Sequence, residues 1–322
     1  MSLALVNILP SDTTIPFIKA RFVAFIVSAA MIIGSIGAFA TMGLNFGIDF
    51  TGGVTLEVRT EEEIDADKID EMRGLLNGLG LGAIELQGLS EIDPESDCFG
   101  NRCALIRVQP QEGEGLEAEE AQQEANLAVQ GALTDQYPGI EFRSINVLGP
   151  KVSGELVQAG VTSIIVALVL MLIYIWFRFE WQYSVGAVLA LVHDVIITIG
   201  MFAITQLEFN LSTIAAILTI VGYSMNDTVV VYDRIREKLR KFKKEPLEVV
   251  LNRAINKTLS RTILTSVTTL VALISLWALG GAALQGFAFA MIFGVIIGTY
   301  SSIFIAAPLL LITKVKRDTV EG

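Results

Sequence analysis

The sequence has few charged residues for its length. Asp, Glu, Lys and Arg make up 18% of its 322 residues, whereas about a quarter of a typical soluble domain is charged. Hydrophobic residues account for 52% of the chain, and the mean hydropathy is +0.60. These values exclude an ordinary soluble protein and indicate a membrane protein.

The patterns of nucleotide, redox-cofactor and metal sites are also absent. The chain has one histidine and two cysteines, and it contains no Walker sequence, Gly-rich dinucleotide loop or zinc-ligand spacing. We therefore expect no ATP hydrolysis, no enzymatic activity, no metal site and no cofactor. We also expect no nucleic-acid partner. If the protein performs work, an ion gradient or a partner has to drive it.

Long apolar runs, by contrast, are abundant. Six of them approach the ~20 residues that a helix needs to cross a bilayer. The sequence therefore predicts an α-helical polytopic membrane protein with six transmembrane helices. The runs lie at about 22–43, 156–177, 183–205, 212–232, 263–281 and 286–312.

Basic residues predict the orientation of these helices, because Lys and Arg in short loops stay in the cytoplasm. Lys19 and Arg21 precede the first run, Lys314 follows the last, and a dense series separates the fourth run from the fifth. Both termini are therefore expected in the cytoplasm. The predicted cytoplasmic segments are 1–21, 233–261 and 314–322.

The segment 44–152, called the outer domain below, has a different composition. It is acidic and rich in turn residues, which indicates a domain on the periplasmic side. Its periodicities follow the order βαββαβ, typical of a ferredoxin-like α+β unit with both helices on one sheet face. The other face would be free to bind. The predicted strands are 54–60, 83–89, 103–110 and 140–148, the helices are 65–80 and 116–137, and transmembrane helices 2–6 follow over 153–313.

Asp227 is a carboxylate within the fourth apolar run. A charge in hydrocarbon costs at least ~2.5 to 3.5 kcal/mol, so some feature of the protein has to favour its presence. Tyr223 and Ser224 share its helix face and Asn226 is adjacent. This polar patch indicates a functional site.

Other polar residues lie in neighbouring runs. Arg261 begins the fifth run, Thr265 follows on the same face, and Asp194 lies beside His193 in the third. Hydroxyl groups can hold water inside a bundle, and Arg261 could oppose the charge of Asp227. The alternative is that these side chains only join helices through hydrogen bonds of about 1 kcal/mol each. We expect that role for the Ser and Thr residues, and His193 fits a core residue as well as a proton relay.

Cys98 and Cys103 lie in the outer domain in the stretch "CFGNRC". An oxidising compartment permits a disulfide between them, and the spacing leaves bridged and free thiols both open.

Basic residues are densest over 236–244. This run predicts contact with anionic lipids. The residues after it, 246–259, predict an amphipathic surface helix that opens at Pro246.

Three stretches together resemble a known family. They are "FGIDFTGG" (46–53), "VGYSMNDTVVVYDRIRE" (221–237) and "SRTILTS" (260–266). The chain resembles the SecF branch of the SecD/SecF family, which belongs to the bacterial Sec protein-export machinery and to the RND superfamily. The likeness extends over the whole chain.

The resemblance implies one half of an RND-type transporter in the bacterial inner membrane. With SecD it would use the proton gradient to promote late steps of preprotein translocation through the SecYEG channel, and YajC is a further candidate partner. The acidic outer domain is expected to contact unfolded preprotein. The motif that would join the first helix to this domain consists of Gly47, Asp49, Gly52 and Gly53.

Within the membrane, Asp227 matches the family's carboxylate and Arg261 its partner arginine. With the polar residues described above, the predicted proton-coupling set is Asp227, Arg261, Asp194, Asn226, Tyr223 and Thr265.

Three alternatives belong to other classes of protein. An RND-type exporter half for lipids or drugs would need an apolar tunnel, and one small outer domain is little material to build it. An intramembrane aspartyl protease could use Asp194 and Asp227, but "SMND" replaces the expected G-x-G-D. A passive scaffold of the translocon would tolerate Asn at position 227.

Overall fold

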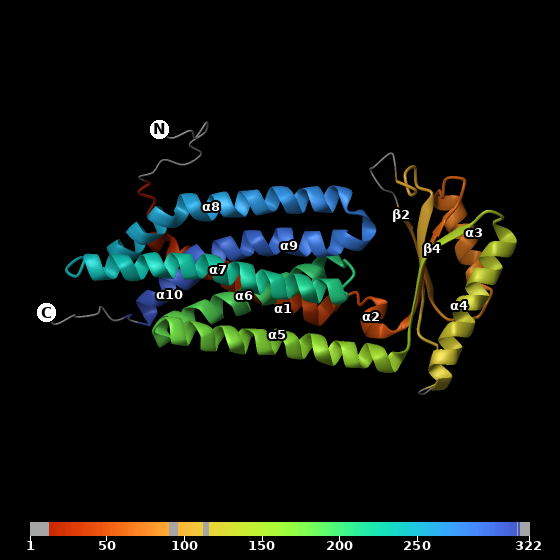
Figure 1. Cartoon of the computed structure of the whole chain (residues 1–322), viewed down its shortest axis with the longest axis horizontal. Helices are drawn as coiled ribbons and strands as arrows, with labels where there is room; N and C mark the ends of the chain where they lie inside the picture. Colours follow the sequence, from red (N-terminus) through yellow and green to blue (C-terminus); the bar gives the residue numbers. More distant parts are fainter. Residues whose placement is uncertain (1–12, 90–95, 112–115, 314, 316–322) are drawn as a thin grey trace.

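The computed structural model describes residues 13–89, 96–111, 116–313 and 315. A bundle of long helices carries a small sheet domain at one end (Figure 1). The described residues include six helices long and apolar enough to cross a membrane, as the sequence predicts. The long helices are α1 (Arg21–Met42), which continues the short 3₁₀ helix η1 (Phe17–Ala20), α5 (Pro150–Arg178), α6 (Trp181–Thr205), α7 (Leu211–Lys241), α8 (Leu247–Leu279) and α9 (Gly281–Ser301), which continues through η2 (Ser302–Ala306) into α10 (Ala307–Ile312).

Burial differs among these helices. The most apolar windows of α6, α7 and the last span are mostly buried, whereas α1, α5 and α8 expose most of theirs. The bundle core therefore lies along α6, α7 and α9, and the other three helices present apolar surface outward. Such surface is stable only against lipid or against another membrane protein.

The predicted cytoplasmic segment 233–261 is mostly helical. Helix α7 continues to Lys241 and α8 begins at Leu247, so only 242–246 connects them. A helix does begin after Pro246, but the prediction of a surface helix over 246–259 was wrong, because this segment is the first part of α8. Its apolar side chains Val250, Leu251 and Ile255 are buried in the bundle core, because the helix continues without a break into the fifth span.

The outer domain follows the predicted order of elements. Its four strands form one antiparallel sheet in the order β2-β3-β1-β4, which is compatible with a ferredoxin-like unit. A one-turn helix, α2, precedes the first strand. The elements are α2 (Ile48–Thr51), β1 (Gly53–Arg59), α3 (Ala66–Asn77), β2 (Ile84–Leu89), β3 (Cys103–Val108), α4 (Leu116–Gln136) and β4 (Glu141–Leu148).

The two faces of this sheet have different surroundings. Val54, Leu56 and Val58 of β1 are fully buried in the core that the sheet forms with α3 and α4, while alternate residues point to the opposite face. Figure 1 shows α3 and α4 on the side of the sheet away from the long helices. The helix-free face, expected to bind preprotein, is therefore turned toward the membrane bundle.

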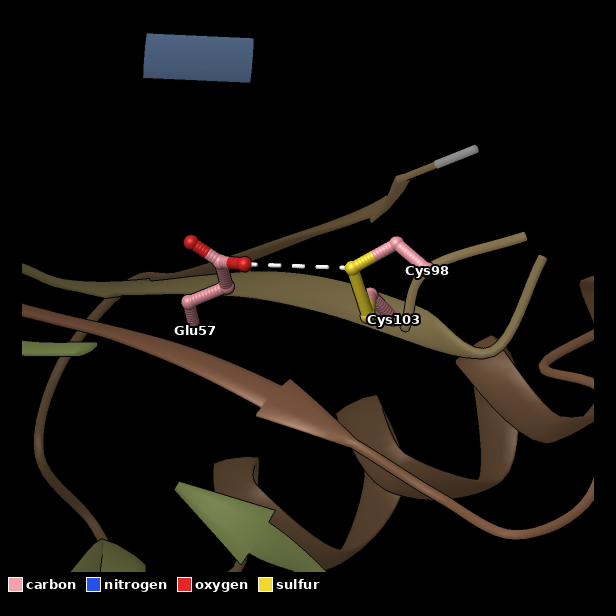
Figure 2. Close-up of side chains that lie close together, drawn as sticks. All are labelled: Glu57, Cys98 and Cys103. Atoms are coloured by element: carbon pink, nitrogen blue, oxygen red, sulfur yellow. Dashed lines mark hydrogen bonds between the residues drawn. A yellow bond between two sulfur atoms is a disulfide. The ribbon is translucent and has the colours of Figure 1, made fainter. Parts of the chain in front are cut away.

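Cys98 and Cys103 form a disulfide next to the helix-free face. Figure 2 shows the Glu57 carboxylate beside it, 3.9 Å from Cys98 Sγ. Arg143 donates to Glu57 at 2.7 Å and lies 2.6 Å from the same sulfur. Glu57, Cys98 and Cys103 lie close enough together to be considered as three metal ligands. Metal binding by cysteine requires thiolates, however, and the two sulfurs are bridged.

Candidate functional site

Asp227 lies in the membrane bundle where α7 meets α8. Its side chain is 9% exposed, and Oδ1 accepts a hydrogen bond of 2.7 Å from the Thr262 hydroxyl. Oδ2 has no hydrogen-bond partner within the described part of the chain. The Ser302 hydroxyl, at the start of the π-helical turn η2, donates to the Gly298 carbonyl at 2.7 Å.

Asp194 of α6 has a contrasting environment. Its Oδ2 accepts hydrogen bonds of 2.7 Å from Ser224 and Ser301, and its Oδ1 lies 2.9 Å from His193 Nδ1. The residue is 1% exposed. Three helices thus converge on this carboxyl, since Ser224 belongs to α7 and Ser301 to α9.

The two carboxyls therefore have different chemical capacities. Asp194 accepts hydrogen bonds from α7 and α9 and contacts His193 of its own helix, so it holds three helices in register. Asp227, with one hydroxyl donor and one unpartnered oxygen, has no comparable network around it.

His193 connects the Asp194 cluster to the first helix. Its ring stacks on Tyr300 with 6.1 Å between centroids. The Tyr300 hydroxyl donates to the Ala24 carbonyl at 2.9 Å and lies 3.0 Å from Ser28 Oγ. His193 is thus part of the packing between α1, α6 and α9, and the position of α1 depends on this cluster.

The other predicted residues are not all gathered around Asp227. Arg261, Thr265 and Asn226 are exposed, and Thr265 bonds only to carbonyls of its own helix. The described residues show no ion pair between Arg261 and Asp227. Tyr223 points inward, and its buried hydroxyl has no hydrogen-bond partner in that part of the chain. The buried hydroxyl residues of α8 are Thr258, Thr262 and Ser266. Thr262 donates to Asp227 and Ser266 pairs with Thr299, whereas Thr258 bonds to carbonyls of its own helix.

The glycine motif lies far from Asp227, but it contacts α7, the helix that carries Asp227. Gly47 N–H donates to the Phe209 carbonyl at 2.9 Å, and Phe209 N–H donates to the Asn45 carbonyl at 2.7 Å. Asp49 Oδ2 accepts from Leu211 N–H at 2.9 Å. Because the first N–H groups of a helix have no intrahelical partner, Asp49 caps α7 from a distant part of the sequence.

An ion pair adds a second link between the outer domain and the membrane helices. Arg107, on the helix-free face of β3, pairs with Glu208 in the connection between α6 and α7. Partial burial lowers the pKa of Arg107 from its usual value, and the Glu85 carboxylate opposes this effect. A guanidinium stays charged at physiological pH, so Arg107 remains available as the cation of this pair.

The glycines of the motif have separate roles. A Cβ at position 47 would collide with the Glu208 carboxylate. Gly52 and Gly53 have φ of 76° and 115°, values that favour glycine, and a Cβ on Gly53 would meet the Val108 carbonyl. The motif therefore turns the chain into β1 and leaves room for Glu208 beside it.

Comparison with known proteins identifies the family. Residues 128–316 match the family model described as protein export membrane protein SecD/SecF, C-terminal. Residues 37–64 match the SecD/SecF GG motif. The protein translocase subunit SecF of Rhodobacter capsulatus is 44% identical over 314 residues, which cover 97% of this chain and 92% of that protein. The chain belongs to the SecF family.

Other SecF proteins and solved structures agree with this assignment. The SecF subunit of Rickettsia rickettsii is 42% identical over 309 residues, covering 94% of this chain and 93% of its own. The crystal structure of SecDF, a translocon-associated membrane protein from Thermus thermophilus, matches with a TM-score of 0.81 at 32% identity. The match covers 96% of this SecF-family chain and 40% of the SecDF chain.

A second structure, SecDF in a super-membrane-facing form, matches this SecF-family chain with a TM-score of 0.67 at 33% identity. The identities are nearly equal while the TM-scores differ. This chain is therefore more similar in structure to the first than to the second.

Proposed function

We propose that this chain is the SecF half of a SecD–SecF pair that uses the proton gradient to promote late steps of preprotein translocation through SecYEG. It works without a resident cofactor and without enzymatic chemistry. It resides in the bacterial inner membrane with both termini in the cytoplasm and the outer domain in the periplasm. Family membership and the six apolar helices support this proposal.

The observation that carries the proton-coupling step is the environment of Asp227. Its single hydroxyl donor and unpartnered Oδ2 permit both a neutral form that tolerates an apolar bundle and a charged form that prefers water or a cation. Asp194, whose oxygens are occupied by His193, Ser224 and Ser301, is a fixed structural carboxylate. An aspartyl protease needs two carboxyls that share one site, whereas the partners of Asp194 are His193, Ser224 and Ser301 and the partner of Asp227 is Thr262.

The contacts of α7 supply a route from Asp227 to the outer domain. At the N-terminus of α7, Asp49 accepts a hydrogen bond from the Leu211 N–H. Glu208, which lies just before this helix, pairs with Arg107 of the sheet. A shift of α7 on protonation of Asp227 would therefore act on the motif and on β3 together.

The proton gradient supplies enough energy for such a shift. One proton crossing ~150 mV releases about 3.5 kcal/mol, which changes a two-state equilibrium by more than about a hundredfold. This amount is sufficient to bias the placement of a domain held by a few polar contacts.

Exposed polar residues indicate where SecD binds. Asn226, Arg261 and Thr265 are exposed on membrane helices α7 and α8, where contact with lipid would be costly. SecD would cover this face and bring its own groups toward Arg261. SecYEG, YajC and unfolded preprotein at the outer domain complete the proposed partners.

The decisive experiment substitutes Asp227→Asn, which is nearly isosteric and cannot titrate. The variant should copurify with SecD in normal amounts yet lose the gradient-dependent part of export in inverted or reconstituted vesicles. Asp233→Asn is a matched control, because Asp233 lies on the same helix but its side chain is 63% exposed and pairs with Arg178. Full gradient-dependent export by Asp227→Asn would leave a passive scaffold as the better description.

A further inference from the structure

A cleft of about 550 Å³ lies at the end of the bundle opposite the outer domain. It is lined by residues of the segment 13–19, of the first turns of α8 and of the last turns of α7. Figure 1 shows these parts of α7 and α8 at the end of the bundle away from the sheet. Its volume is in the range of small-molecule sites. The cleft is distinct from the Asp227 and Asp194 sites and from the glycine motif.

The floor of the cleft is built by two asparagines one turn apart on α8. Asn256 donates to the Ile15 carbonyl at 2.8 Å and accepts from Ile15 N–H at 2.9 Å. Asn252 donates to the same carbonyl at 3.0 Å and accepts from Ile18 N–H at 3.3 Å. These bonds hold the segment before α1 in place, so the cleft is preformed.

The walls are rich in basic residues. The lining includes Lys19, Lys238, Arg253 and Lys257 with one carboxylate, Glu248, and Lys238 pairs with Glu237 outside the lining at 3.5 Å. Arg21 neutralises that carboxylate at 2.8 Å. Arg253 is oriented by Glu245 and by the ring of Phe242, 3.0 Å and 4.3 Å away respectively.

Lys19 contributes an uncompensated charge. Across the described ranges of the chain it has no ion-pair partner, and its side chain is exposed and lines the cleft. Lys257 lines the same cleft, so an anion bound there would lie near both lysines. Multiple cations around one preformed hollow favour a phosphate group over a single carboxylate.

Apolar surface borders this polar cleft. Val249, which lines it, is 45% exposed, and α1 continues from Arg21 with Phe22 and Ile26, which are 65% and 69% exposed. A ligand with a phosphate head and hydrocarbon chains would satisfy both surfaces at once. A free anion would contact only the basic cleft and not the apolar surface.

We propose that this cleft binds the phosphate headgroup of an anionic phospholipid of the cytoplasmic leaflet, with the acyl chains lying along α1. The inference rests on the proposed orientation, which places this end of the bundle in the leaflet that attracts basic residues. It moves the lipid contact from the basic run 236–244, where the sequence suggests it, to the cleft between the segment 13–19 and α8.

The test is native mass spectrometry of the full-length protein in a neutral detergent, titrated with phosphatidylglycerol or, as the neutral probe, phosphatidylcholine. Lys19→Gln/Lys257→Gln should weaken phosphatidylglycerol binding by at least about fivefold. Lys241→Gln/Lys244→Gln removes the same charge from the basic run and should change binding by less than about twofold. Lys19→Glu alone, at an exposed position, should weaken binding without touching the floor.

Two results would overturn the inference. Equal losses in the two double variants would mean diffuse attraction to the whole basic end. Displacement of the lipid by millimolar inorganic phosphate would mean that the cleft selects a free anion. Binding is measured without SecD and without a gradient, so failure here leaves the export proposal untouched. Full gradient-dependent export by Asp227→Asn, which would overturn the export proposal, likewise leaves the lipid site untouched.

Discussion

At the scale of single residues, two intramembrane carboxyls have opposite surroundings. Asp194 is enclosed by donors from its own helix and two others, whereas Asp227 has a hydroxyl on one oxygen only. A buried group whose partners are all in place contributes to stability, and removing it leaves those partners unsatisfied. The two residues should therefore respond differently to substitution.

We predict that Asp194→Ala destabilises the protein by at least about 2 kcal/mol, because His193, Ser224 and Ser301 lose their acceptor in a buried site. Asp227→Asn should leave the melting temperature close to that of the parent, since Thr262 can still donate to the amide oxygen. Thermal unfolding of the detergent-solubilised protein measures both. Asp233→Ala serves as the exposed control, and an unchanged melting temperature for Asp194→Ala would contradict the structural role.

At the scale of elements, α7 connects two regions that are distant in the sequence. Near its middle it carries Asp227, and its first N–H is capped by Asp49 of the motif. Phe209, just before α7, forms a parallel β-bridge with Phe46, which lies just before the motif. The connection between α6 and α7 is thus the point where the outer domain meets the membrane bundle.

We predict that the Arg107–Glu208 pair restrains the outer domain. Arg107→Gln or Glu208→Gln should broaden the distance distribution between spin labels at positions 134 and 279. The double variant should broaden it no further than either single variant, because each removes the same ion pair, with a coupling of about 1 kcal/mol. The measurement is pulsed electron paramagnetic resonance on the purified protein.

Two comparisons sharpen that experiment. The charge exchange Arg107→Glu/Glu208→Arg should restore the narrow distribution. Arg59→Gln removes an ion pair with Glu141 inside the sheet, so it should leave the distribution unchanged. If the single variants gave distance distributions as narrow as that of the parent, the Arg107–Glu208 pair would not restrain the outer domain.

At the scale of the whole molecule, charge and shape are divided between the two ends. The sheet domain caps one end of the bundle (Figure 1), and basic residues gather at the other, around the connection from α7 to α8. This asymmetry is the physical basis of the proposed orientation, since basic connections stay on the cytoplasmic side.

Cysteine accessibility tests this orientation. The two native cysteines are bridged and the described chain has no free cysteine, so the background should be low. In intact spheroplasts, Thr134→Cys should react with a membrane-impermeant maleimide, whereas Lys244→Cys should react only after lysis. Both positions are exposed, so burial cannot explain a difference. The reverse pattern would invert the proposed topology.

The sequence by itself determined the features that depend on local pattern. Runs of about 20 apolar residues predict the membrane helices because a bilayer imposes their length. Alternation and helical periodicity predicted the four strands and the two longer helices of the outer domain to within a few residues of their observed ends, because each sheet or helix face must bury its apolar side. The one-turn helix α2 was not predicted. Asp227 was also predictable, since a carboxyl in an apolar run is conspicuous on its own.

Only the tertiary structure decided which polar groups meet. The predicted partner Arg261 is exposed, whereas Thr262 contacts Asp227, because a rotation of about 100° per residue separates adjacent positions on a helix. Ser301 and Glu208 carry no local signal, and their roles arise from partners more than 100 residues away, at Asp194 and Arg107. Hydrogen bonds and ion pairs of this kind depend on helix crossings and domain placement, which periodicity does not encode.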